Sequence, residues 1–319
     1  MAGATLNPPE DLPLDLPLDP PGWTRAPERG SIFWLRVMIG ITGALGWRAG
    51  HLLLFPITAY FLAFSPRQRA AARQFLGRAL GRPAGFAALW RLYFSFAASI
   101  LDRVWLASGR TAGFEITVHG LEALRQRMAA GQGCLLFGAH LGSFEALRAV
   151  ADAGCPVDVA VLMHEANAAR VKAVFDALGG AGRAASVIPL GAPESMLRVR
   201  EVLECGGLVG LLADRAPPGQ RLQRVEFLGH PAPLPTGPHV LAAMLGVPVM
   251  LAFGIRLGPR RYAVHFEPFA ERIGGGGRVG RDAAVAASVV QYAARLEAMA
   301  RAHPDNWFNF YAFWQEGQP

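Results

Sequence analysis

His140 and Glu145 lie five residues apart, and they are the pair of side chains in this chain whose spacing best suits acid–base chemistry. A neutral imidazole takes a proton from a hydroxyl near neutral pH, and a carboxylate beside it fixes the tautomer of the ring. In one continuous helix the two side chains would lie about 140° apart around the axis. The pair therefore predicts His140 in a turn as general base, with Glu145 as its orienting carboxylate in the next helix. The alternative is a histidine that only ends a strand before a capped helix.

Gly142 and Ser143 lie between these two residues in the predicted turn, and both are candidate substrate-binding residues. Ser143 is the expected N-cap of a helix over residues 143–152, where Glu145 suits the positive end of the helix dipole. The apolar run 134–138 comes directly before the turn and predicts a short buried strand that delivers the histidine.

Strand and helix patterns alternate along residues 111–319, which predicts an α/β domain with a mostly parallel central sheet flanked by helices. Reactive groups of such a sheet lie at the carboxyl ends of its strands. Asn167 and Asp214, like His140, follow predicted strands. The expected strands are 114–119, 134–138, 157–163, 186–190, 208–212, 247–253 and 262–266, and the helices among them 121–129, 143–152, 168–178, 193–205, 237–245 and 281–302.

Two further motifs are candidate binding sites. Asp214 and Arg215 place a charge pair at the end of a buried strand, where it is costly unless it is partnered or belongs to a site. The alternative is a structural ion pair. Thr236 opens a helix whose free amides suit an anion, and the alternative is a simple capped turn. His164 and Glu165 lack the second histidine of a zinc motif, because residue 168 is alanine.

The amino-terminal third differs in composition from the rest. Residues 1–30 are Pro-rich and predict a disordered tail. Residues 31–110 predict a membrane-associated helical region whose apolar run, 32–64, fits an imperfect spanning helix, a monotopic hairpin or a buried helix pair. Residues 24–110 carry twelve arginines against two acidic residues, which favours anionic lipid headgroups. No nucleic-acid-binding motif accompanies this charge, so nucleic acid is not an expected partner.

The segment from His140 to Glu145 resembles the His-x4-Asp/Glu signature of the lysophospholipid acyltransferase superfamily, in particular its bacterial branch of lauroyl and myristoyl lipid A acyltransferases. The resemblance implies fatty acyl transfer from a thioester, on acyl carrier protein rather than coenzyme A, to a hydroxyl or amine of a lipid or glycolipid. It implies direct attack without an acyl-enzyme, metal or bound cofactor, at the cytoplasmic face of the inner membrane. Further blocks that carry it are 163–170, 211–215, 227–229, 235–238 and 303–314.

The same resemblance suggests roles for single residues. Arg170 is expected to hold a phosphate or phosphopantetheine group, although it could be only an exposed arginine at a helix start. Amides from 138 to 143, or the Arg170 side chain, are expected to stabilise the oxyanion. Arg215 departs from the pattern of that branch, in which the residues at positions 214 and 215 are more often Asp-Gln. This departure leaves the identity of the acceptor open.

Two rival functions remain. One is a non-catalytic, membrane-associated lipid-binding protein of the same fold. The other is a serine thioesterase or lipase, which the missing Gly-x-Ser-x-Gly motif disfavours. The aromatic segment 307–314 could line an acyl channel, lie on lipid or close the core, and the core is the favoured interpretation.

Overall fold

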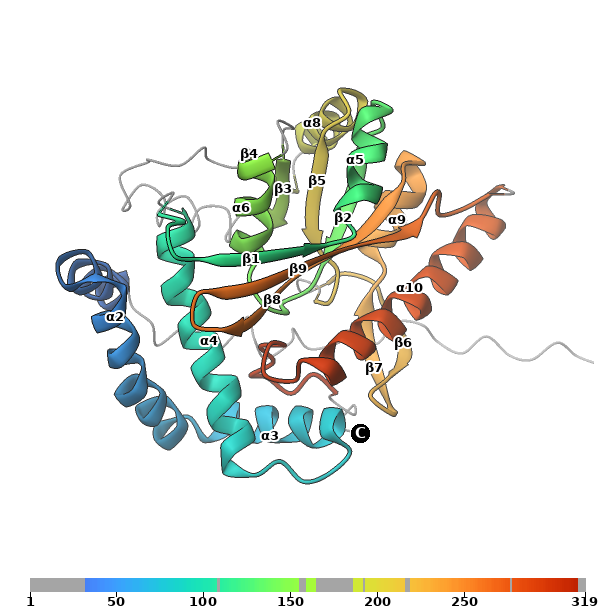
Figure 1. Cartoon of the computed structure of the whole chain (residues 1–319). Helices are drawn as coiled ribbons and strands as arrows, with labels where there is room; N and C mark the ends of the chain where they lie inside the picture. Colours follow the sequence, from blue (N-terminus) through green and yellow to red (C-terminus); the bar gives the residue numbers. More distant parts are fainter. Residues whose placement is uncertain are drawn as a thin grey trace, which may run out of the picture.

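The computed structural model describes residues 32–107, 110–154, 159–164, 186–191, 193–215, 219–275 and 277–314. Its centre is a seven-stranded sheet in the order β1-β9-β8-β2-β5-β3-β4 (Figure 1). Strands β8, β2, β5, β3 and β4 run parallel, whereas β9 is antiparallel to β8 and parallel to β1. The strands are β1 Glu115–His119, β2 Cys134–Gly138, β3 Val159–His164, β4 Ser186–Leu190, β5 Leu208–Leu212, β8 Val249–Gly258 and β9 Arg261–Ala270.

The sheet confirms the predicted α/β class and its mostly parallel arrangement. Strand β2 is buried along its whole length, as expected for a continuous apolar run covered by helices on both faces. The predicted strands 134–138, 186–190 and 208–212 have the observed bounds, and β8 and β9 extend further than expected. The predicted helix 168–178 lies outside the described residues.

One element was not predicted, a hairpin of β6 Leu222–Phe227 and β7 His230–Pro235 that forms a separate two-stranded sheet. Three prolines in β7 argue against a strand in the sequence. They are accommodated because β7 pairs on one side only, with β6.

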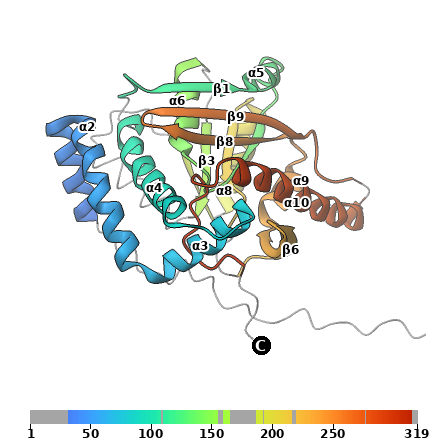
Figure 2. The same ribbon diagram turned by 60° about the horizontal axis from the view of Figure 1, so that its bottom comes forward.

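Helices cover both faces of the large sheet. One buried cluster joins α3, α4 and α10 to one face, and a second joins α5 and α6 to the other. Helices α2, α3 and α4 lie together along one flank of the molecule (Figure 2). The helices are α2 Ile32–Phe64, α3 Pro66–Leu80, α4 Phe86–Ala107, α5 Leu121–Ala129, α6 Phe144–Gly154, α8 Pro193–Glu204, α9 Gly237–Leu245 and α10 Gly277–Ala302.

Helix α2 is half-buried. Gly46 interrupts it with φ 82° and ψ 172°, a conformation open to glycine. Leu54 is 0% exposed against α4, while Leu52 and Phe64, at 68% and 61% exposed, point outward. Residues 46–64 of α2 thus pack on α4 with one side, as the buried-pair alternative expected, and expose other apolar side chains. Among the described residues no single helix is long and apolar enough to cross a membrane, but Gly46–Phe64 with Pro66–Leu80, bent by 97°, passes that test as a pair.

Candidate active site

His140 and Asp214 are brought together by the register of two adjacent parallel strands. Gly138 at the end of β2 pairs with Leu212 at the end of β5. His140 and Asp214 each follow two residues after the end of their strand, so the two side chains emerge at the same edge of the sheet. Nδ1 of His140 lies 2.9 Å from Oδ1 of Asp214. This is the carboxyl edge at which an α/β sheet places its reactive groups.

Asp214 is fully buried and accepts several hydrogen bonds. Its Oδ2 accepts from the backbone N–H of His140 at 3.1 Å and from Nε1 of Trp307 at 3.1 Å. Burial alone would raise the pKa of Asp214, but His140, Arg215 and Trp307 more than offset it, so this pKa lies well below its usual value. The carboxylate is ionised at neutral pH and orients the imidazole with the proton on Nδ1.

Among the described residues, Nδ1 is the ring nitrogen of His140 that has a hydrogen-bond partner, and Nε2 has none. The side chain is 40% exposed, whereas Asp214 is 0% exposed. Desolvation and the charge of Arg215 lower the pKa of His140, and Asp214 acts in the opposite direction. The ring is therefore neutral near pH 7 and can accept a proton at Nε2, as a general base must.

Glu145 does not occupy the orienting position that the spacing predicted. Its Oε1 lies 2.8 Å from Nε of Arg103 on α4, and its Oε2 accepts from the Ser143 hydroxyl at 3.4 Å. In the described part of the chain no hydrogen bond or ion pair joins Glu145 to His140. The predicted turn and helix start are present, but Asp214 takes the place at Nδ1, because the strand register brings a second carboxylate closer to that atom.

The turn between His140 and Glu145 is held by backbone hydrogen bonds. Gly142 has φ 78°, and an added Cβ there would lie 1.9 Å from the carbonyl oxygen of Gly254. The N–H of Gly142 donates to the Asn306 carbonyl, and the N–H of Ser143 donates to the Gly254 carbonyl. These two amides therefore hold the turn and are not free for an oxyanion, which differs from the expectation for this segment.

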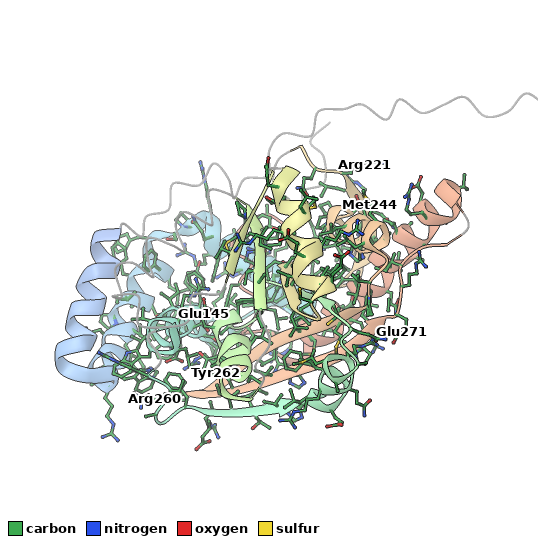
Figure 3. The ribbon with its side chains drawn as sticks, turned by 90° about the horizontal axis from the view of Figure 1, so that it is seen from above. Glu145, Arg221, Met244, Arg260, Tyr262 and Glu271 are labelled. Carbon is green, nitrogen blue, oxygen red and sulfur yellow. The ribbon has the colours of Figure 1, made fainter. Side chains whose placement is uncertain are left out.

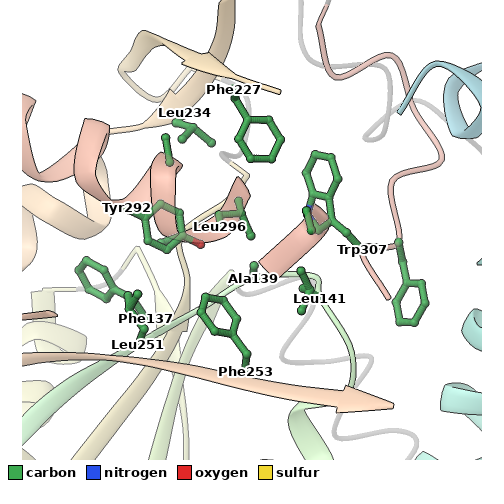
Figure 4. Packing of buried hydrophobic residues seen from close by; sticks show 14 of the residues in the cluster. Phe137, Ala139, Leu141, Phe227, Leu234, Leu251, Phe253, Tyr292, Leu296 and Trp307 are labelled. Carbon is green, nitrogen blue, oxygen red and sulfur yellow. The ribbon is translucent and has the colours of Figure 1, made fainter. Parts of the chain in front are cut away.

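The segment that contains Trp307 was expected to be core, and its second role was missed. Trp307 is fully buried among aromatic rings beside Ala139 and Leu141 (Figure 4). It also donates to Asp214, and the N–H of Phe308 donates to the His140 carbonyl at 3.0 Å. The sequence signal was an indole N–H in an apolar segment, because a buried tryptophan usually has a hydrogen-bond partner.

The remaining predicted residues are distributed as follows. Arg215 lies next to the pair: its Nε is 3.5 Å from Asp214, and its Nη2 donates to the Phe308 carbonyl. The Thr236 hydroxyl makes no cap bond and donates instead to the Arg221 carbonyl. Arg221 lies across the molecule from Glu145 (Figure 3). Asn167 and Arg170 lie outside the described residues.

A narrow apolar cavity of about 40 Å³ lies between α6 and the sheet. It begins at the turn, where Leu141 and Ser143 contribute to its wall, and it continues over the small residues Gly138 and Ala252. Among the described residues, no group of three or more His, Cys, Asp or Glu side chains is placed to hold a metal ion. Large residues that line the cavity include Leu124, Leu136, Phe144, Leu147, Leu208 and Phe266.

Comparison with known proteins identifies the family. A search of curated proteins finds no match. Residues 27–316 match the family model described as bacterial lipid A biosynthesis acyltransferase. Because this match spans nearly the whole chain, together with the histidine–carboxylate site, the protein belongs to the bacterial lipid A biosynthesis acyltransferase family.

Proposed function

We propose that the protein transfers a fatty acyl group from an acyl thioester to a hydroxyl or amine of a lipid or glycolipid acceptor, with His140 as general base. The observation that carries this proposal is the buried carboxylate of Asp214 on Nδ1 of His140, which leaves Nε2 as a base at a partly exposed edge. Asp214 replaces Glu145 as the proposed orienting group.

The reaction proceeds by direct attack. Nε2 of His140 takes the proton as the acceptor oxygen or nitrogen forms a bond to the thioester carbonyl carbon. The tetrahedral intermediate then collapses, the carbon–sulfur bond breaks, and the imidazolium returns its proton to the leaving thiolate. Asp214 stabilises the imidazolium between these steps. The proposed oxyanion donor is the Arg170 side chain or another amide of residues 138–141, because the Gly142 and Ser143 amides are engaged in the turn.

The acyl chain is proposed to enter the cavity beside the turn. Its apolar lining suits a hydrocarbon, and it begins next to the base. An apolar cavity that binds benzene has a volume of about 150 Å³, so the present cavity of about 40 Å³ is too small for a fatty chain. Entry of the chain therefore requires Phe144 and Leu147 of α6 to move away from the sheet.

The proposed location is the cytoplasmic face of the inner membrane. The outward residues Leu52, Phe55 and Phe64 of α2, at 68%, 47% and 61% exposed, support contact with lipid. We name these three residues the α2 apolar group. The exposed arginines Arg67, Arg73 and Arg82 follow directly in the chain, where they suit anionic headgroups. Acyl carrier protein is the preferred donor, because an acidic carrier complements a chain of net charge +7.

Mass spectrometry of cellular lipids tests the proposal. Cells with the gene should contain a lipid species that carries one more acyl chain than the corresponding species in cells without it. Complementation with His140→Ala should leave that species absent while the protein accumulates normally. Restoration of the species by His140→Ala would favour the non-catalytic lipid-binding alternative. A dependence on a serine, with release of free fatty acid in the absence of acceptor, would favour the thioesterase.

A further inference from the structure

Arg103 is a charged residue beside the base that the proposed acyl transfer does not use. It lies on α4 and holds Glu145 through Nε, at 2.8 Å. Its side chain is 48% exposed, whereas that of Glu145 is 14% exposed. The Arg103 side chain is therefore accessible to solvent, although the carboxylate that it pairs with is largely covered.

The position of Arg103 relative to His140 follows from two contacts. Glu145 follows the His140 turn, and the charge of Arg103 contributes to the lowered pKa of His140. Seven residues earlier on α4, Phe96 packs against Phe308 with ring centroids 5.2 Å apart. The N–H of Phe308 donates to the His140 carbonyl. Both contacts connect α4 to the turn that carries the base.

Phe96, Ile100 and Arg103 lie on one face of α4, because residues four and seven apart share a helix face. Phe96 is 37% exposed and Ile100 is partly exposed. We name these three residues the α4 stripe. It presents two apolar side chains followed by a cation, next to the partly exposed ring of His140.

A guanidinium suits this arrangement better than an ammonium would. Its planar fork has five N–H donors and binds phosphate or carboxylate in a bidentate manner. Glu145 engages Arg103 through Nε and so fixes the guanidinium. Because the Arg103 side chain is 48% exposed, a second anion can approach it from solvent. The ligand chemistry that matches the stripe is an amphiphile with an anionic group next to its hydrocarbon part.

Resting on the proposed acyl transfer, we propose that Arg103 binds the anionic headgroup of the lipid acceptor, a phosphate or a carboxylate, while its hydrocarbon part lies along Phe96 and Ile100. This contact would hold the acceptor hydroxyl or amine at Nε2 of His140. The prosthetic group of a carrier protein also contains a phosphate, so the test must separate the two sources. The apolar residues of the stripe favour the acceptor.

Binding of simple probes tests this without requiring turnover. Dodecyl phosphate and dodecyl maltoside are titrated below their micelle concentrations, and the ¹⁵N-labelled imidazole signal of His140 is followed by NMR. The wild type should bind dodecyl phosphate at least tenfold more tightly than the maltoside, with movement of the His140 signal. Arg103→Met should lose this preference, whereas Arg91→Met, at an exposed arginine on the same helix, should keep it. Equal preference in Arg103→Met and wild type would overturn the proposal.

Two controls make the result specific. Because Glu145 is only 14% exposed, loss of its partner can lower the Tm of Arg103→Met, so the Tm is measured to check that this variant is folded at the temperature of the titration. Phe96→Ala should weaken binding of dodecyl phosphate but not of inorganic phosphate. Free phosphopantetheine is titrated in parallel. If Arg103→Met weakens binding of phosphopantetheine but not of dodecyl phosphate, Arg103 binds the phosphate of the donor, and its assignment to the acceptor is wrong. These measurements report binding and not turnover. A protein that prefers dodecyl phosphate to dodecyl maltoside but transfers no acyl group would refute the proposed acyl transfer and leave the role of Arg103 in anion binding intact.

Discussion

Asp214 lies beside His140 because Gly138 and Leu212, the last residues of the adjacent strands β2 and β5, pair with each other. His140 and Asp214 each follow two residues after this pair. The contact between the two side chains thus depends on sheet order rather than on sequence spacing. Glu145, closer in sequence, is held by Arg103 instead. The two carboxylates can be separated by mutation.

Asp214→Asn should lower kcat by about 10²- to 10⁴-fold. The amide can donate to Nδ1, which favours the wrong tautomer, and it carries no charge to stabilise the imidazolium. Steady-state kinetics with an acyl carrier protein thioester measures this, with circular dichroism to check folding. Glu145→Gln should cost much less in kcat. A severe loss in Glu145→Gln together with near-normal Asp214→Asn would return the orienting role to Glu145.

The pH dependence should respond to the charges around His140. Burial and Arg215 lower the pKa of this group below 6.5, Asp214 opposes them, and Arg103 adds to the lowering. A base works unprotonated, so kcat/KM should fall as the pH decreases through this lowered pKa. Arg215→Met removes a positive charge, which raises the pKa and moves the acid limb of the profile to higher pH. Arg91→Met serves as control, and a limb that stays in place in Arg215→Met would contradict the assignment.

Replacing the α2 apolar group, Leu52, Phe55 and Phe64, with serine should release the protein from lipid vesicles. Full burial of such side chains contributes roughly 1.5–3 kcal/mol each, so even partial insertion predicts at least a tenfold lower partition coefficient. Flotation with vesicles containing phosphatidylglycerol measures the loss. A matched triple serine variant of Leu197, Met244 and Val290, which are 63%, 70% and 53% exposed on other helices, should float like the wild type. Equal flotation of the two variants would exclude the α2 apolar group as the lipid contact.

Donor use should depend on ionic strength if the carrier is steered by charge. The second-order rate constant with an acyl carrier protein thioester should fall as salt rises from about 50 to 500 mM, since added salt shortens the Debye length. The same measurement with the coenzyme A thioester provides the comparison. Equal rate constants for the two donors, with no effect of salt, would remove the carrier protein from the proposal.

Filling the cavity should change the preferred acyl length. Ala252 is 3% exposed and lines the cavity, so Ala252→Leu should reduce activity with long acyl donors about tenfold more than with short ones. Overpacking costs typically about 1–3 kcal/mol, so stability needs its own control. Ala263, 4% exposed and outside the cavity lining, provides it as Ala263→Leu. An unchanged length preference in Ala252→Leu would exclude the cavity as the acyl site.

The sequence predicted the parts of the site that depend on local pattern. The strand before His140 was recognisable as a continuous apolar run, and Asp214 as a charge at the end of another. The pairing of these two strands was not predictable, because several sheet orders satisfy the same alternation of strands and helices. The β6–β7 hairpin was missed because its prolines argue against a strand, although pairing on one side only tolerates them.

The hydrogen bond from Trp307 to Asp214 also has a consequence for the order in which the protein folds during its own synthesis. The ribosome makes the base and its carboxylate first and this indole much later, since Trp307 follows His140 by more than half the length of the chain. Until the segment around Trp307 leaves the exit tunnel, Asp214 lacks one of its hydrogen-bond donors and the His140 turn lacks the backbone partners Asn306 and Phe308. His140 and Asp214 therefore gain their full set of hydrogen-bond partners only after residues 306–308 have been synthesised and have folded against them.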